Sequence, residues 1–371
     1  MKKKILSLLI MLSLVLSLTA CGQENAIENT GTTTESAEVI TEEDNGTESA
    51  LEEDSIAEES SSDTLITQYP VTVTDQAGRE VTIESEPQKL VSGYYISSSL
   101  LIALDLDDKL VGIEAKANKR PIYNLSAPEL IDLPNVGTAK EFDLEGCIAL
   151  EPDLVILPLK LKNTAESLEN LNIDVLYVNP ENQELLTEMM TLIGTATNTQ
   201  EKTNELMNFV KNHETTLTNT LANAEAPSVY LAGNSSMLST AGSAMYQSNM
   251  ITLAGGKNVA ADITDTYWVD INYEQLLTWN PEYIILASDA NYTVDDVLTD
   301  PNLAECSAIK NNKVYQMPSK AESWDSPVPS GILGSVWLAT ILHEDLFSAD
   351  DASAIIDEYY ETFYDFKYSE K

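Results

Sequence analysis

Residues 143–157 decide the fold, and they read Asp143-Leu144-Glu145-Gly146-Cys147-Ile148-Ala149-Leu150-Glu151-Pro152-Asp153-Leu154-Val155-Ile156-Leu157. A short segment of helical character leads through Pro152-Asp153 into a continuous apolar run. The same order recurs in residues 272–286, where Pro281-Glu282 leads into a second apolar run. Continuous apolar strands that alternate with helices are typical of parallel sheets covered on both faces.

Other short, β-branched runs extend this pattern over most of the chain. They form two sets, and the interval between the sets contains no Pro or Gly from residue 197 to residue 226. Apolar residues at helical spacing in that interval predict one long helix. The predicted strands are 71–73, 80–83, 89–91, 109–113, 153–157 and 174–178 in the first set, and 228–232, 282–286 and 313–316 in the second.

These patterns predict an α/β fold of two Rossmann-like lobes with parallel-type sheets. The amino-terminal lobe is expected at residues 69–196 and the carboxy-terminal lobe at 227–371, joined by a rigid backbone helix at 197–226. A ligand cleft is expected between the lobes, beyond the carboxyl ends of their strands. Because a long helix is a stiff connector, we expect no large hinge opening.

The first 68 residues differ from the rest of the chain. Lys2, Lys3 and Lys4 precede an apolar run too short to span a membrane comfortably, which is typical of a signal peptide. Residues 18–22 resemble the bacterial lipobox, which implies that residues 1–20 are removed and that Cys21 becomes the lipid-carrying first residue. The alternative is an ordinary cleavable signal with an incidental cysteine. Residues 21–68 are acidic and contain no Lys, Arg or aromatic residue, so we expect a disordered stalk there.

Composition excludes several classes of function. The formal net charge of −40 argues against nucleic acid as a partner, because binding to phosphates needs clustered Lys and Arg. His213 and His343 are the only histidines in the sequence, so a His-rich metal site or a His-dependent catalytic triad is not expected. Cys147 and Cys306 lie in different predicted lobes, and we expect both to be free thiols.

Five motifs in order resemble one known family, the helical-backbone (class III) periplasmic binding proteins. These are the solute receptors of ABC importers for iron–siderophores, haem, cobalamin and related metal complexes. Asp105 is a departure, since it stands where the family usually has Gly. The resemblance covers residues 69–348, and its motifs are residues 71–83, 100–113, 135–156, 253–259 and 272–282.

The resemblance implies an extracytoplasmic solute-binding lipoprotein that delivers its ligand to an ABC permease and its ATPase. We expect a monomer without a cofactor, anchored by lipid to the extracytoplasmic face of the cell membrane, in the manner of a Gram-positive surface protein. The expected ligand is a metal chelate, a ferric siderophore first, with haem, cobalamin and a metal oxyanion as alternatives. A surface hydrolase and a non-transport sensor or adhesin are further alternatives, but the sequence has no Gly-x-Ser-x-Gly elbow or suitable His base.

Side chains in the loops beyond the strand ends are the candidate ligand-binding residues. Six Lys and Arg residues fall in these loops of an otherwise cation-poor chain, which indicates an anionic ligand or one with peripheral carboxylates. The aromatic residues there suit a wet cleft, although they could equally be core packing, and direct ligation of iron is not expected. The candidates are Tyr94, Tyr95, Lys116, Lys119, Arg120, Lys140, Lys160, Asn234, Ser236, Met237, Tyr246, Trp268, Lys320 and Trp324.

Glu145 and Glu274 occupy matched positions, each at the start of the helix that precedes a strand. In the family that this chain resembles, the matching glutamates contact arginines of the permease. A carboxylate at a helix N-terminus stays ionised and accepts a bidentate Arg. We therefore expect both residues to dock the protein to its permease; the alternative is a charge that only stabilises the helix N-terminus.

Overall fold

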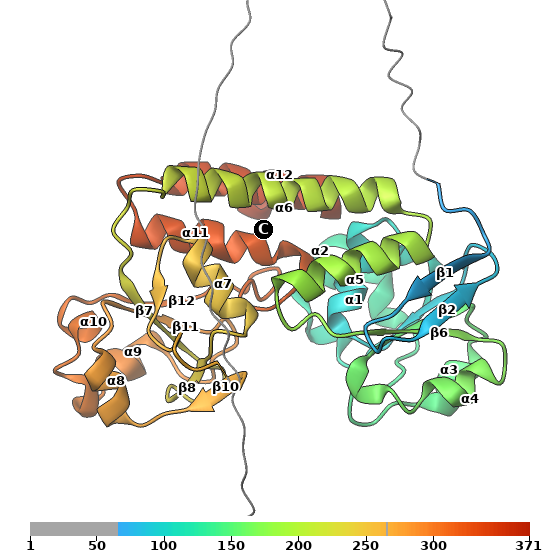
Figure 1. Ribbon diagram of the computed structural model, residues 1–371, viewed down its shortest axis with the longest axis horizontal. Coiled ribbons are helices and arrows are strands. Elements are labelled where there is room, and N and C mark those ends of the chain that lie inside the picture. Colours follow the sequence, from blue (N-terminus) through green and yellow to red (C-terminus); the bar gives the residue numbers. More distant parts are fainter. Residues whose placement is uncertain (1–65, 265) are drawn as a thin grey trace, which may run out of the picture. The chain divides into compact units, whose positions relative to one another are not determined.

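The computed structural model describes residues 66–264 and 266–371 (Figure 1). The predicted signal peptide, Cys21 and nearly all of the predicted stalk lie outside the described residues. Within the described part of the chain, no helix is long and apolar enough to cross a lipid bilayer.

The amino-terminal lobe contains a four-stranded parallel sheet in the order β4-β3-β5-β6. Every residue of its central strand β5 is buried, as expected for a sheet covered on both faces. An antiparallel hairpin precedes the sheet and turns at Gly78, whose φ of +76° favours glycine. The strands are β1 (Val71–Thr74), β2 (Glu80–Ile83), β3 (Leu90–Ser92), β4 (Leu110–Ile113), β5 (Leu154–Pro158) and β6 (Asp174–Val178).

The carboxy-terminal lobe contains a second parallel sheet, in the order β12-β11-β7-β9, and a separate antiparallel pair, β8 and β10. The sequence pattern predicted β7, β11 and β12 but not the other three strands, which are very short and only partly apolar. The strands are β7 (Ser228–Ala232), β8 (Ser239–Ala241), β9 (Lys257–Asn258), β10 (Trp268–Asp270), β11 (Tyr283–Leu286) and β12 (Val314–Gln316).

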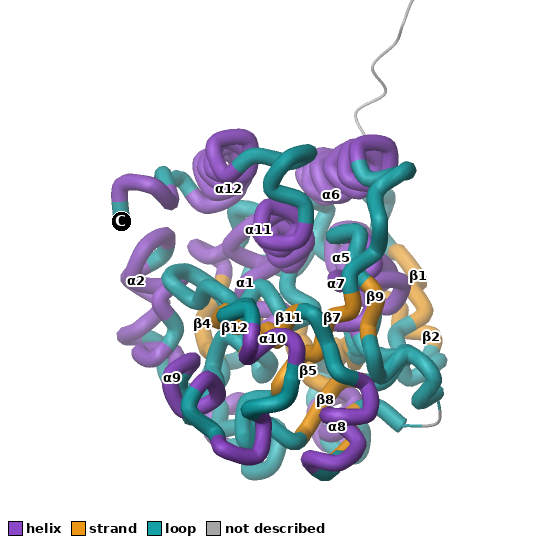
Figure 2. The backbone as a smooth tube through the Cα atoms, turned by 90° about the vertical axis from the view of Figure 1, so that its left-hand side faces the viewer, coloured by secondary structure: helices purple, strands orange, loops and turns teal. Residues whose placement is uncertain are grey.

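The predicted long helix is present as α6 (Gln200–Thr220) and is part of a layer of helices that joins the two lobes. Helix α6 is shorter than the helix predicted at 197–226, because Asn198 has a left-handed φ of +60° and separates it from α5 (Gln183–Ala196). Helices α6 and α12 (Ala349–Tyr364) lie on either side of α11 (Ile332–Leu342) (Figure 2). Helix α12 also contacts α1 (Tyr95–Ala103) of the amino-terminal lobe, so the last helices belong to both lobes.

Of the remaining helices, α3, α4, α8, α9 and α10 cover the outer faces of the sheets, whereas α2 and α7 pack into the core beneath the helical layer. Most are short, and several are capped at the N-terminus by a side-chain oxygen, as α3 is by Asp143 and α8 by Asn272. They are α2 (Pro121–Ser126), α3 (Leu144–Ala149), α4 (Ala165–Glu169), α7 (Tyr246–Leu253), α8 (Tyr273–Trp279), α9 (Val294–Leu298) and α10 (Ser307–Lys310).

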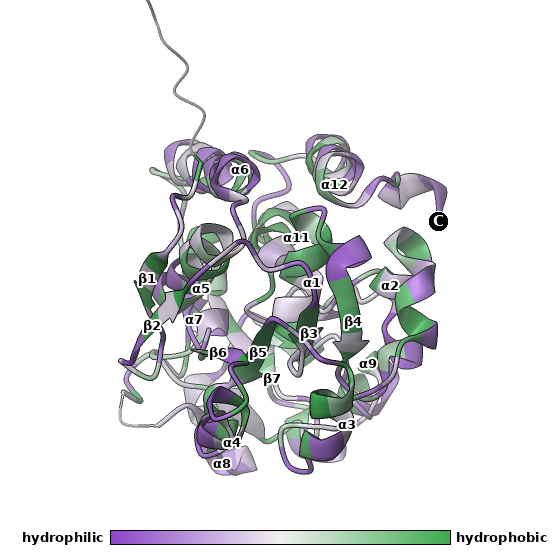
Figure 3. Cartoon of the chain, turned by 90° about the vertical axis from the view of Figure 1, so that its right-hand side faces the viewer, coloured by the Kyte–Doolittle hydropathy of each residue, from purple (hydrophilic) through white to green (hydrophobic). Residues whose placement is uncertain are grey.

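One continuous hydrophobic core runs through the helical layer and reaches both sheets. Leu154 and Ile156 of β5 contribute to it from one lobe, and Leu231 and Ile285 contribute from the other. The opposite face of each sheet packs into a core of its own, and Cys147 and Cys306 lie in these two outer cores as buried free thiols, as predicted. Figure 3 shows that β4 and β5 are mainly apolar, whereas α6 contains both apolar and polar residues. The shared core resists relative movement of the lobes, because separating them would expose apolar surface.

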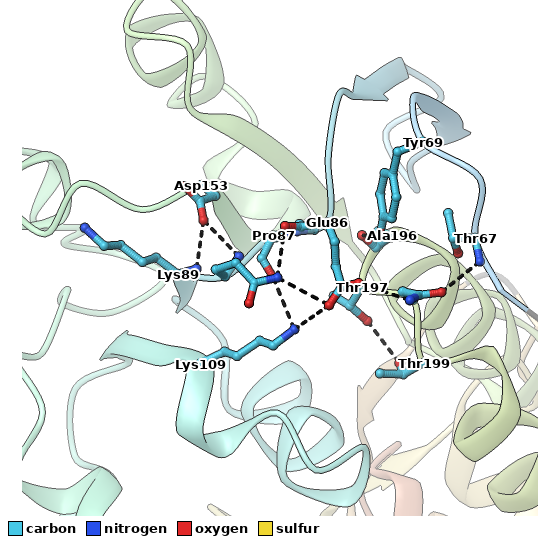
Figure 4. A network of polar contacts seen from close by, with 12 residues as sticks. Thr67, Tyr69, Glu86, Pro87, Lys89, Lys109, Asp153, Ala196, Thr197 and Thr199 are labelled. Carbon is cyan, nitrogen blue, oxygen red and sulfur yellow. Dashed lines mark hydrogen bonds and ion pairs between the residues drawn. The ribbon is translucent and has the colours of Figure 1, made fainter.

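Polar contacts hold the turn between α5 and α6 against the edge of the amino-terminal sheet (Figure 4). Glu86 accepts hydrogen bonds from Lys109 Nζ at 2.8 Å and from Asn198 Nδ2 at 3.0 Å. The Oδ1 atom of Asn198 accepts the backbone N–H of Thr67 at 2.8 Å. A hydrogen bond from the Lys109 ammonium holds the pKa of the Glu86 carboxyl below its usual range.

Candidate functional site

A cavity of about 470 Å³ lies between the two lobes. Most of its lining residues follow the carboxyl ends of β3, β4 and β6 in one lobe and of β7, β11 and β12 in the other, which is where parallel α/β sheets bind ligands. Its lining residues are Gly93, Tyr94, Tyr95, Ile96, Glu114, Ala115, Lys116, Arg120, Gly137, Thr138, Ala139 and Glu181 of the amino-terminal lobe, and Asn234, Met245, Gln247, Trp268, Asp289, Ser323, Ser326 and Pro327 beyond it.

Two cations line the cavity, and both come from the loop between β4 and α2. The Arg120 guanidinium lies over the Tyr95 ring, with its central carbon 3.8 Å from the ring centroid. Neither the Arg120 guanidinium nor the Lys116 ammonium has a hydrogen bond or ion pair to any side chain or carbonyl of the described residues. Their donor groups are therefore free to bind an anion.

The buried Glu322 carboxyl binds the tyrosine against which Arg120 packs. Glu322 is 2% exposed and accepts hydrogen bonds from Tyr95 Oη at 3.1 Å and from Ser99 Oγ at 2.6 Å. Its second oxygen accepts from Ser330 Oγ at 2.6 Å. Burial raises the pKa of the Glu322 carboxyl, while these hydrogen bonds and the Arg120 charge oppose the rise. Glu322 thus holds the Tyr95 ring on which Arg120 rests.

Glu114 is a second buried acid, and it lines the cavity itself. It accepts Ser98 Oγ at 2.6 Å and Tyr123 Oη at 2.7 Å. Burial raises the pKa of this carboxyl too, and the Arg120 charge again opposes the rise. With Glu181 and Asp289, the lining contains three carboxyl groups beside its two cations. Among the residues described here, no group of three or more His, Cys, Asp or Glu side chains is arranged to hold a metal ion.

Six of the fourteen predicted ligand-binding residues line the cavity. Trp268 is notable among them because it is 42% exposed, a large solvent-accessible fraction for such a side chain inside a cleft. The six are Tyr94, Tyr95, Lys116, Arg120, Asn234 and Trp268.

The other eight lie outside the cavity lining. Trp324 is buried, and its indole N–H donates to Tyr360 Oη at 2.9 Å, so it is a core residue of the helical layer. Tyr246 is also buried, against Gly331. Lys320 donates to the Tyr368 carbonyl at 2.9 Å. The remaining five lie in loops and short turns away from the lining: Lys119, Lys140, Lys160, Ser236 and Met237.

Sequence reasoning missed the carboxyl groups of the lining and Gln247. Glu114 directly follows β4, and Asp289 comes three residues after β11, so their positions were a usable signal. Gln247 lies in the first turn of α7 and had no such signal, because its place in the cavity depends on how α7 packs.

The two predicted docking residues belong to α3 and α8, which lie toward the edge opposite to α6 in Figure 1. Glu145 is exposed in the first turn of α3, and Glu274 is exposed in the first turn of α8. Both helices begin with a capping side chain that accepts a backbone N–H at the third helical position. The positive end of each helix dipole therefore lies beside a solvent-facing carboxylate.

Comparison with known proteins gives a consistent result. Residues 90–321 match the family model described as periplasmic binding protein. The molybdate-binding protein MolA of Haemophilus influenzae is 27% identical over 319 residues, covering 79% of this chain and 90% of the relative. An ABC transporter substrate-binding lipoprotein of Bacillus subtilis, YvrC, is 26% identical over 260 residues, covering 67% and 78%. The crystal structure of a periplasmic solute binding protein from Veillonella parvula aligns with a TM-score of 0.70 at 26% identity, covering 80% and 93%.

The buried Glu322 carboxyl predicts a pH-dependent stability. Because its pKa is raised in the folded state, its contribution is fully present below the ordinary value of 4.5 and is lost as pH rises through the folded pKa. E322Q does not titrate, and it loses part of the hydrogen-bonded network. We expect its free energy of unfolding to be lower than that of wild type by about 1–3 kcal/mol near pH 5. This difference should narrow as the pH is raised toward about 8, because only wild type loses stability there.

Urea denaturation across that pH range measures the difference. The exposed Glu344 provides the matched control, because E344Q removes a carboxylate without touching the network. If the difference in free energy of unfolding between E322Q and wild type widens as the pH rises, the pKa of the Glu322 carboxyl is not raised in the folded state.

Proposed function

Because this chain belongs to the periplasmic binding protein family, whose members are extracytoplasmic substrate-binding proteins of ABC importers and not enzymes, we propose that it captures an anionic metal chelate. A ferric siderophore is the first candidate. The solute would bind in the cavity between the lobes and be handed to the permease, with the ATPase driving uptake. The hydrolase alternative is excluded by the family.

The observation that carries this proposal is the arrangement of Arg120. Its planar guanidinium rests on the Tyr95 ring and keeps its donor groups unpaired among the described residues. Such a group binds a carboxylate or another paired-oxygen anion in a bidentate manner. Lys116 adds a second charge nearby, and the exposed Trp268 ring offers an apolar face to the organic part of a chelate.

The mixed charge of the lining favours a chelate over a bare oxyanion. Glu114, Glu181 and Asp289 line the same cavity as the two cations. A compact dianion would be repelled by these carboxylates, whereas a larger complex can direct its anionic groups to one wall and its donor groups to the other. A metal oxyanion is the second candidate, supported by the relative that is named a molybdate-binding protein.

We further propose that Cys21 carries the lipid anchor after removal of residues 1–20, and that residues 21–68 form the stalk. The lipobox-like sequence supports this, as does the Bacillus subtilis relative that is named a lipoprotein. Anchoring would confine the receptor beside its importer and raise its effective concentration there.

Glu145 and Glu274 are proposed as the permease contacts. Both carboxylates are exposed at helix N-termini, one in each lobe, where the helix dipole keeps them ionised. Arginines of the permease would bind them with charge-assisted hydrogen bonds.

Removal of the Arg120 charge tests ligand capture. In R120Q we expect the dissociation constant for the chelate to rise about 10- to 100-fold, because a charge-assisted hydrogen bond is lost. Tryptophan fluorescence, to which Trp268 contributes from the cavity, measures binding of ferric siderophores, haem, cobalamin and molybdate. K320Q removes a cation outside the lining and should bind like wild type. If R120Q and K320Q both bind like wild type, the ligand does not occupy this cavity.

The docking proposal separates binding from uptake. The double variant E145A and E274A should keep the wild-type affinity, because neither residue lines the cavity, and should lose uptake of radiolabelled ligand by whole cells. As a control, the exposed pair E129A and E344A should transport normally. Lost affinity in the docking variant would refute the separation of roles.

A further inference from the structure

Gln247 contains a buried acceptor atom for which the folded protein provides no donor. The side chain is 6% exposed and lines the cavity. Its Nε2 donates to the backbone carbonyl of Asp325 at 2.7 Å, but its Oε1 has no hydrogen-bond partner in residues 66–264 or 266–371. Four buried side-chain atoms of the described residues lack a partner, and of the residues that contain them only Gln247 lines the cavity.

The orientation of this amide is fixed by chemistry. Rotating it by half a turn would place Oε1 against the Asp325 carbonyl, where two acceptors would face each other and no bond would form. The Asp325 segment is itself held, because the Asp325 carboxylate accepts the Ser288 hydroxyl and the Ser288 backbone N–H at 3.1 Å. Oε1 is therefore the free end of a rigidly placed group.

The cations of the cavity lie on one wall only. Both Lys116 and Arg120 belong to the amino-terminal wall, together with the carboxyl groups of Glu114 and Glu181. The opposite wall contains no Lys or Arg among its described lining residues, and it contains Gln247 and the Asp289 carboxylate, which already accepts Ser323 Oγ at 3.0 Å. A solute group that faces the opposite wall therefore meets acceptors without a cation beside them.

We propose that Gln247 Oε1 is an acceptor subsite that selects solutes bearing an N–H or O–H donor opposite their anionic group. A buried acceptor without a donor is costly, so a solute that donates to it gains affinity that an acceptor-only solute does not. This inference rests on the proposed function and narrows it. The solute class is a metal chelate with amide or hydroxyl groups, and fully ionised molybdate and haem, which offers only propionate acceptors, are disfavoured.

Two pairs of probes test the subsite on the full-length protein. Ferric aerobactin and cyanocobalamin each carry an anionic group and amide N–H donors, whereas molybdate and haem present acceptors only. Wild-type protein should bind at least one donor-bearing probe and prefer it over both acceptor-only probes. This comparison needs no substitution and stands even if a variant fails to fold.

The variant Q247M then tests the residue itself. We expect it to weaken binding of the donor-bearing probe about five- to tenfold and to leave any binding of molybdate or haem unchanged. Q275M, on α8 outside this cavity, is the matched control and should bind like wild type. Loss of the preference in Q247M alone supports the subsite.

The results that would refute the subsite differ from those that would refute the receptor function. If molybdate alone binds, and R120Q weakens it, the acceptor subsite is wrong while the receptor function stands. If Q247M binds the donor-bearing probe like wild type, the solute does not donate to this oxygen and the subsite is wrong. If none of the four probes binds, the proposed chelate receptor is overturned together with the subsite.

Discussion

The hydrogen bonds to the buried Glu322 carboxylate are the interaction on which the cavity depends. This single group accepts donors from Tyr95 and Ser99 of α1 and from Ser330, which lies just before α11. It therefore joins the amino-terminal lobe to the chain segment that enters the helical layer. A buried carboxylate needs all of its partners, because an unpaired charge away from water is strongly destabilising. The network therefore specifies one relative placement of these elements.

That placement determines the electrostatics of the site. Tyr95 is held through its hydroxyl, and its ring supports the Arg120 guanidinium. Burial raises the pKa of both the Glu322 and the Glu114 carboxyl, the Arg120 charge opposes that rise, and neither carboxyl forms an ion pair that would occupy the guanidinium donors. The cation is thus positioned before the solute arrives, which reduces the entropy lost on binding. The shared core between the lobes also connects the elements that carry the two walls of the cavity.

Much of the fold could be predicted from the sequence, because its strands are buried on both faces and appear as continuous apolar runs. Asp105 is the one residue that the sequence showed to depart from the family pattern, and the fold accepts it. It replaces the expected glycine, adopts a φ of +57°, and its carboxylate pairs with Lys202. The short strands β8, β9 and β10 could not be predicted, because they have too few residues for an alternation to be visible. The long helix predicted at 197–226 is present as α6, with both ends a few residues inside the predicted bounds, and the left-handed Asn198 separates it from α5.

The site was only partly predictable, for a related reason. Lys116 and Arg120 were found because they follow a strand end, and local sequence decides that position. Trp324 was expected to line the cleft, but it is buried against Tyr360 and Tyr368. These two residues belong to the last segment of the chain, so no local pattern could indicate the contact. Glu322 and Gln247 were missed because their partners are far away in sequence. Buried polar networks depend on tertiary packing, and no local pattern reports them.

A crystal structure of the protein purified from its own host, with anomalous diffraction recorded for its metal content, tests the central claim most directly. We predict an anomalous peak between the lobes, with oxygen atoms of the bound complex within hydrogen-bonding distance of the Arg120 guanidinium. A bound metal complex in another place, such as the groove between α5 and α6, would contradict the account. So would a metal-free, uncharged solute in the cavity.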